Sequence, residues 1–329
     1  MKYFRSSIVI SIIGLALAFY LGGVNALYIT ALLAILEVSL SFDNAVVNAK
    51  VLETMEPKWQ KRFITFGIPI AVFGMRFVFP IVIVAVASHM GIYETFKVAI
   101  DDPQKYKETL ESVEKLIYAF GGSFLLMIFL SFLFDEDREE RWITIIEESR
   151  LIHKLTEVNN ISIIIAMGIG LALVQQTGSQ AIAMAYFGGV FLHALILSLD
   201  DLLSTDGIRS GIMGLLYLEV LDASFSFDGV IGAFALSSDI FIIMLGLGIG
   251  AMFVRSMTIY LVEMKTLAEY RYLEHGAHYA ILALALIMFG KMFIHIDELI
   301  VGTIGVTFIA ISAIHSVMEN KKEEKERDN

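Results

Sequence analysis

The stretch that decides the fold is EVSLSFDN, residues 37–44, which places two carboxylates, two hydroxyls and an amide inside an apolar segment long enough to cross a bilayer. A charged side chain near the bilayer centre is costly, so it is rare and usually marks an ion or substrate path. Residues 222–229, DASFSFDG, repeat the pattern with acid, serines, phenylalanine and aspartate in matching places. The two copies predict an internal repeat built around an ionic site.

Composition places the chain in the membrane. It is 57% hydrophobic and 18% charged, with a mean hydropathy of +0.73, whereas soluble domains carry about 25% charged residues. Apolar runs of roughly 20 residues recur along the chain, which predicts an all-α, polytopic helix bundle in a lipid bilayer. The absence of cysteine excludes disulfides and thiolate metal sites. The net charge of −11 argues against a nucleic-acid partner.

About ten spans can be placed on the sequence. They are residues 7–23, 25–47, 63–88, 116–134, 161–174, 181–199, 211–236, 240–262, 279–294 and 299–317. The first run could be a cleaved signal peptide, but no polar region separates it from the next run, so a retained helix is preferred. The expected parts are an N-terminal membrane half (1–134), a charged, solvated cytoplasmic linker (135–158), a C-terminal membrane half (159–318) and a charged, disordered tail (319–329).

Basic residues set the expected orientation. With ten spans, the side that holds both termini collects 17 Lys and Arg, and the opposite side collects four. Because cytoplasmic loops are enriched in Lys and Arg, we expect a multi-pass protein of the cell membrane with both termini in the cytoplasm.

The two acidic stretches lie in spans two and seven, which run in opposite directions. An arginine-bearing span follows each of them: Arg76 comes nine residues after Gly67, and Arg255 comes nine residues after Gly246. This arrangement is typical of an inverted-topology repeat, in which paired stretches meet near the membrane midplane.

Helical geometry sorts the polar residues of both stretches. At 100° per residue, one stripe within about 60° holds four of them: Glu37, Ser41, Asn44 and Asn48. The matching stripe of the second copy comprises Asp222, Ser226 and Gly229, with Glu219 one turn earlier. Asp43 and Asp228 lie about 120° from their partner acids. They either face another neighbour or the helix loosens locally, and we favour the second option.

The charges inside the spans do not balance. Five acids, Glu37, Asp43, Glu219, Asp222 and Asp228, face three basic residues, Arg76, Arg255 and Lys291. A bound divalent cation would neutralise the excess, with protons as a candidate coupling ion. Carboxylate, amide and hydroxyl oxygens suit hard ions such as Mn²⁺, Mg²⁺ or Ca²⁺.

The motifs resemble a known family. Glu37-x-x-x-Ser41-x-Asp43-Asn44 resembles the first-repeat signature of the TerC family, within the LysE-like transporter superfamily, and residues 219–228 resemble its second signature. The resemblance covers about residues 34–76 and 218–263. It implies Mn²⁺ efflux as the activity, with a link to tellurium resistance.

Two functions from different classes follow. In the first, the chain is a divalent-cation transporter, in which Glu37, Asp43, Asp222 and Asp228 act as ligands or proton carriers, supported by Ser41, Asn44, Ser226 and Glu219. Arg76 and Arg255 then serve as counter-ions or gating groups. In the second, it is a non-transporting membrane factor that assists metalation, insertion or envelope stress resistance, with a structural metal site. The acids could also simply pair with the arginines to hold the bundle together.

Other polar residues have plainer interpretations. Without a nucleophile–base set, a His-rich cluster or a P-loop, we expect no enzyme. His193 is either a packed bundle residue or a proton relay, and Lys291 is expected to extend toward the membrane interface.

Overall fold

The structure is a computed structural model that describes residues 2–135, 138, 140–203, 211–237, 239–265 and 269–327. The side chains of Phe227 and Asp228, among a few others within the helices, lie outside the described part. In the described residues every regular element is a helix, which confirms the predicted all-α fold.

Six helices are long and apolar enough to cross a membrane, or eight if each of two sharply bent pairs forms one span. The six are α1 (Arg5–Leu40), α6 (Pro103–Leu133), α10 (Gln180–Leu203), α12 (Ile240–Glu263), α14 (Leu273–Lys291) and α15 (Glu298–Arg327). The chain is therefore a multi-pass helical membrane protein, and the expected count of ten spans is not confirmed by its described residues.

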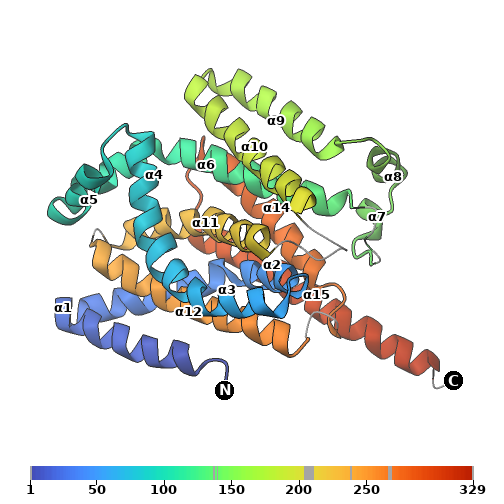
Figure 1. Cartoon of the computed structure of the whole chain (residues 1–329), viewed down its shortest axis with the longest axis horizontal. Coiled ribbons are helices and arrows are strands. Elements are labelled where there is room, and N and C mark those ends of the chain that lie inside the picture. The colour runs from blue at the N-terminus through green and yellow to red at the C-terminus, as the bar shows by residue number, and fades with distance from the viewer. Residues whose placement is uncertain are drawn as a thin grey trace.

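Helix α1 turns back on itself near its middle. The backbone leaves helical geometry at Gly22 and Gly23, and Gly23 has φ of 66° and ψ of −153°, a conformation that glycine adopts without steric cost. Figure 1 shows the two arms of α1 lying side by side. The reversal falls at the boundary predicted between the first two spans.

Both arms of α1 pack on α12. In the first arm, the Ser7 hydroxyl donates to the carbonyl oxygen of Met252 over 2.8 Å. In the second arm, Glu37 lies so close to Gly250 that a Cβ on the glycine would clash with the Glu37 Cβ. Because opposite ends of α1 reach the same level of α12, the two arms run in opposite directions.

The first acidic stretch is divided between two helices. Helix α1 ends at Leu40 and α2 (Phe42–Glu53) begins after Ser41, whose φ of −109° and ψ of 17° interrupt the helix. The predicted loosening is thus confirmed in the first copy. In the second copy, α11 (Gly211–Leu236) passes through residues 222–229 without a break.

The predicted third span is divided as well. Helix α3 (Pro57–Pro69) leads into a wide π-helical segment, η1 (Ile70–Val78), and then into α4 (Phe79–Ala87). Segments of this kind appear frequently at functional sites. Here the wide segment carries Arg76.

Helix α6 begins outside the predicted span, as expected from Asp102-Pro103. The Asp102 carboxylate accepts the backbone N–H of Lys105 over 3.1 Å, and Pro103 occupies the first helical position. Before it, α5 (Ile92–Asp101) meets the end of the α4 segment at 117°. The linker then forms α7 (Thr144–Glu147) and α8 (Arg150–Thr156), and α8 meets α9 (Ile161–Thr177) at 106°.

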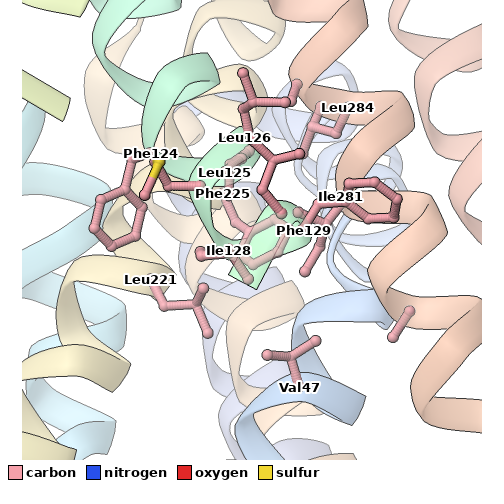
Figure 2. Close-up of a cluster of buried hydrophobic side chains, with 14 of the residues drawn as sticks. Val47, Phe124, Leu125, Leu126, Ile128, Phe129, Leu221, Phe225, Ile281 and Leu284 are labelled. Atoms are coloured by element: carbon pink, nitrogen blue, oxygen red, sulfur yellow. The ribbon is translucent and has the colours of Figure 1, made fainter. Parts of the chain in front are cut away.

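The centre of the bundle is an apolar cluster contributed by α2, α6, α11 and α14. Figure 2 shows its side chains interleaving between the helices. Phe124, Leu125, Leu221 and Ile281 have no exposed surface. Helices α9 and α10 lie against α6 at one side of the molecule (Figure 1).

The C-terminal tail differs from its prediction. It was expected to be disordered from residue 319, but α15 continues to Arg327. The Asn320 amide donates to the Glu269 carbonyl oxygen over 2.8 Å, and Glu323 pairs with Arg271 over 2.7 Å. These contacts support helix where charge density alone predicts a coil.

Candidate functional site

The two acidic stretches meet in an antiparallel arrangement. The Asn44 amide donates to the Asp222 Oδ1 over 2.7 Å. At the other end, the Glu37 Oε2 lies where a Cβ on Gly229 would approach it to 2.8 Å. The first position of each stretch therefore contacts the eighth position of the other. The prediction that the two stretches converge is supported for these four residues.

Arg76 bridges the two acids that begin the stretches. Its Nη2 donates to the Glu37 Oε1 over 2.6 Å, and its Nη1 donates to the Asp222 Oδ2 over 2.7 Å. Both the Arg76 and Glu37 side chains are 1% exposed, and that of Asp222 is 15% exposed. Charge-assisted bonds of this length are among the strongest that proteins form. The guanidinium is the cationic centre of the site.

Local structure holds this bridge in place. The Ser41 hydroxyl donates to the same Glu37 oxygen that accepts Arg76, over 3.1 Å. The Ser226 hydroxyl, expected to support a ligand set, instead donates to the carbonyl oxygen of Met75 over 3.4 Å. It therefore fastens η1 to α11 next to the arginine.

A small cavity of about 20 Å³ lies beside the bridge. Asn48, Arg76, Glu219, Asp222 and Arg255 contribute its polar lining. A space of this size holds one water molecule. The Asn48 Oδ1, the Glu219 Oε1 and two nitrogens of Arg255 are buried without a hydrogen-bond partner in the described residues. Buried polar atoms in native proteins are almost always hydrogen-bonded, so a small polar occupant of the cavity, or a side chain outside the described part, would satisfy these atoms.

The second arginine is held differently from the first. The Arg255 guanidinium stacks over the Phe63 ring at 4.0 Å from its centroid, a geometry in which the ring face attracts the cation. It faces the same cavity as Glu219. Both predicted counter-ions thus lie at one site, with Arg76 bonded directly to acids and Arg255 stacked at the edge.

Asp43, which was expected to share one ligand set with Glu37 and Asp222, faces a different neighbour. Its Oδ1 accepts the backbone N–H of Asn44 over 3.0 Å, and its Oδ2 is directed at Gly305 of α15. Asp43 is 3% exposed. Whether Asp228 completes the site lies outside the described side chains.

The described side chains do not form a ready-made metal centre. No group of three His, Asp or Glu residues among them is placed to hold a metal ion. Glu37 and Asp222 direct oxygens toward one point, but Arg76 occupies that point. A metal ion could use these oxygens only after the guanidinium has moved.

Two polar residues predicted to lie in spans are found away from the acids. Lys291 is 9% exposed, lies at the end of α14 and is near the Tyr118 ring. His193 is 1% exposed, with its ring edge-on to Phe124 at 5.6 Å. Neither contributes to the charge balance at Arg76.

A second buried charge lies in the linker, where only a solvated surface was expected. The Glu147 side chain has no exposed surface. It accepts the Tyr279 hydroxyl over 3.1 Å and the Trp142 backbone N–H over 3.2 Å, and it lies 3.4 Å from the His275 Nε2 and 3.2 Å from an Arg138 nitrogen.

The environment of Glu147 changes its acidity. Burial would raise the pKa of Glu147, but the hydrogen bond and charge of His275 and the charge of Arg138 outweigh it and hold the pKa at about 2. The linker is therefore fastened to α14 by an ionised carboxylate. One signal in the sequence indicates that this part of the linker is buried: the apolar pair Trp142-Ile143 lies in the middle of the charged segment.

Comparison with known proteins places the chain in a family. The family described as "Protein of unknown function (DUF475)" matches residues 42–323. The match includes Asn44, Arg76, Glu219, Asp222 and Arg255, and it begins after Glu37. No curated protein and no solved structure matches the chain.

Proposed function

Because the chain belongs to the DUF475 family, whose description names no activity, we propose a function from the site itself: a membrane transporter of a divalent metal cation, with Mn²⁺ efflux as the expected reaction. Arg76 is the observation that carries the proposal. One guanidinium lies between two carboxylates from the two acidic stretches. In this proposal the guanidinium and the transported cation compete for the same two carboxylates.

Charge supports a divalent ion or two protons. Four described acids, Glu37, Asp43, Glu219 and Asp222, lie in the two acidic segments, with two arginines beside them. If all six groups are ionised, the excess is two negative charges, and Asp228 of the second stretch adds a third. Such an excess is unfavourable within a bilayer. A dication, or protons that replace it, would remove two of these charges, and this is the coupling we propose.

The reciprocal contacts support alternating access. Glu37 and Asp222 are the first positions of the two stretches, and Asn44 and Gly229 are the eighth. In each of the pairs Glu37–Gly229 and Asn44–Asp222, the first position of one stretch contacts the eighth position of the other. Two-fold related contacts of this kind are what an inverted repeat requires. Displacement of α11 against α1 and α2 would separate both pairs together and expose the acids to one side.

A second candidate, a non-transporting membrane factor, has one observation in its favour. Arg76 satisfies both acids in the described state, and the described residues hold no group of three metal-binding side chains. An arginine bridge that never opens would serve only to join α1, η1 and α11.

Reconstitution distinguishes the two candidates. The purified chain is placed in vesicles loaded with a Mn²⁺-sensitive dye, and Mn²⁺ entry is followed with and without a pH gradient. We expect entry for the parent and for Glu94→Gln, an exposed control on α5. Glu37→Gln and Asp222→Asn should lose entry while they keep their helical circular dichroism. A parent protein that moves no divalent cation under either condition would favour the second candidate.

A further inference from the structure

Two polar cavities lie at opposite ends of the same three helices, α6, α11 and α14. The linker-side cavity, of about 300 Å³, is lined by Ser131, Asp135, Tyr217, Glu274 and His278, among others. The far-side cavity, of about 440 Å³, is lined by Glu111, Glu114, Lys115, Ile231 and Lys291, among others. Each cavity takes its lining from one end of every helix of the trio.

Helix geometry gives the separation of the cavities. On α11, Tyr217 lines the first and Ile231 the second, a rise of about 21 Å. On α14, His278 and Lys291 are about 20 Å apart by the same rise. A bilayer core is about 30 Å thick, so the interval between the cavities corresponds to about two-thirds of that thickness.

An apolar seal closes the interval between them. We use this name for six side chains of the trio, which Figure 2 shows together: Phe124, Leu125, Leu221, Phe225, Ile281 and Leu284. Each is at most 8% exposed. Beside the seal, a Cβ on Gly121 of α6 would stand 2.8 Å from the Met288 side chain of α14 and 3.8 Å from the Ser224 carbonyl oxygen of α11. The three helices are therefore in contact there.

The seal borders the ionic site through α11. Leu221 and Phe225 belong to the seal, while Asp222 and Ser226 contact η1 on another face of the same two turns. A displacement of α11 that loosens the seal therefore also shifts Asp222 relative to Arg76.

Resting on the transport function above, we infer that the two cavities are the two mouths of one translocation route, that the apolar seal is the gate that is closed in this state, and that the displacement of α11 which loosens the seal also brings the ion-binding Asp222 into this route. Hydrophobic constrictions exclude water and ions by dewetting. The linker-side mouth would open to the compartment that contains the linker, and the far-side mouth to the other compartment.

A labelling experiment tests the route independently of metal transport. The chain contains no cysteine, so single cysteines can be introduced into the full-length protein in sealed vesicles of known orientation. Three positions on α6 form a matched set: Ser131→Cys in the linker-side cavity, Leu125→Cys in the seal and Glu114→Cys in the far-side cavity. A charged, membrane-impermeant thiol reagent is then added to each side in turn.

We expect Ser131→Cys to label only from the side of the linker, Glu114→Cys only from the other side, and Leu125→Cys from neither until the protein is unfolded. Labelling of both cavity positions from the same side, or of neither, would overturn the route. Rapid labelling at Leu125 in the folded protein would overturn the gate.

The gate has a second test that separates it from the proposed function. Leu221→Asn places an amide in the seal and should raise passive ion leak across proteoliposomes above that of the parent. Leu195→Asn, an exposed position on α10, is the control and should leave the leak unchanged. Correct labelling without Mn²⁺ flux would refute the proposed function alone. Mn²⁺ flux in a protein whose two cavities are labelled from the same side would refute the route alone. An ion leak that does not change in Leu221→Asn would also refute the route and leave the proposed function standing.

Discussion

Replacing Arg76 with alanine tests the central bridge most directly. The substitution removes the cation shared by Glu37 and Asp222 and leaves two carboxylates in a site where the Glu37 side chain is 1% exposed. Removing one partner of a buried ion pair lowers the free energy of unfolding by about 3–5 kcal/mol, because the remaining charge stays buried without a partner. At a few degrees per kcal/mol, the melting temperature in detergent should fall by roughly 5–15 °C.

The same variant should become sensitive to divalent cations. Without the guanidinium, the oxygens of Glu37 and Asp222 face an empty point that Mn²⁺ or Mg²⁺ can fill, since both ions prefer oxygen ligands. Binding to the folded state alone raises stability with ion concentration. We therefore expect millimolar Mn²⁺ to recover part of the loss in Arg76→Ala, measured by scanning fluorimetry.

The control combines Arg76→Ala with Glu37→Gln and Asp222→Asn, which removes the carboxylates and should abolish the ion response. Equal Mn²⁺ stabilisation in the single and triple variants would show that the ion binds elsewhere. An Arg76→Ala melting temperature equal to that of the parent would refute the claim that the bridge stabilises the fold.

Three further changes have defined outcomes. Gly250→Ala should destabilise the protein strongly, because a Cβ at this position would stand 2.9 Å from a backbone carbonyl oxygen of α1. Gly168→Ala is the control and should be tolerated, because nothing lies within 4 Å of a Cβ at that position. The melting temperatures of the two variants are compared. Asn44→Ala should lower the free energy of unfolding by about 1.5–3 kcal/mol, because it removes a hydrogen bond to a charged acceptor, Asp222. A melting temperature equal to that of the parent would contradict this. Because the pKa of Glu147 lies near 2 when folded and near 4.5 when unfolded, its contribution is complete above pH 4.5 and is lost as the pH falls toward 2. The loss of melting temperature over that range should be smaller in Glu147→Gln, and parallel pH profiles would contradict the assignment.

Much of the fold could be predicted because the apolar pattern determines it locally. The bounds expected for the seventh span, 211–236, are those of α11, and α12 differs from its prediction only at one end. The position of Asp43 off the stripe of Glu37 indicated a local loosening of the helix as one of two alternatives, and the structure has an interruption at Ser41. Polar periodicity also placed Glu37, Asn44 and Asn48 at one site.

Long-range partners could not be obtained from the sequence. The charge count treated Lys291 as a counter-ion of the acids, yet it lines a cavity at the far end of α14. Glu147 looked like any other linker acid, because the Tyr279 hydroxyl and the His275 ring that contact it come from α14, which only the tertiary fold brings near. Charge and periodicity are properties of one segment, whereas both of these positions depend on packing between segments.

The glycines of α12 have a mechanical consequence. Gly246 and Gly250 allow the second arm of α1 to approach so closely that backbone oxygens of Thr30 and Ala34 would lie within about 3 Å of any added Cβ. Such a contact resists sliding, so α1 and α12 behave as one rigid unit that carries Glu37. Of the three bridged residues, Glu37 is then the stationary one, and any opening of the bridge must come from displacement of Arg76 on η1 or of Asp222 on α11.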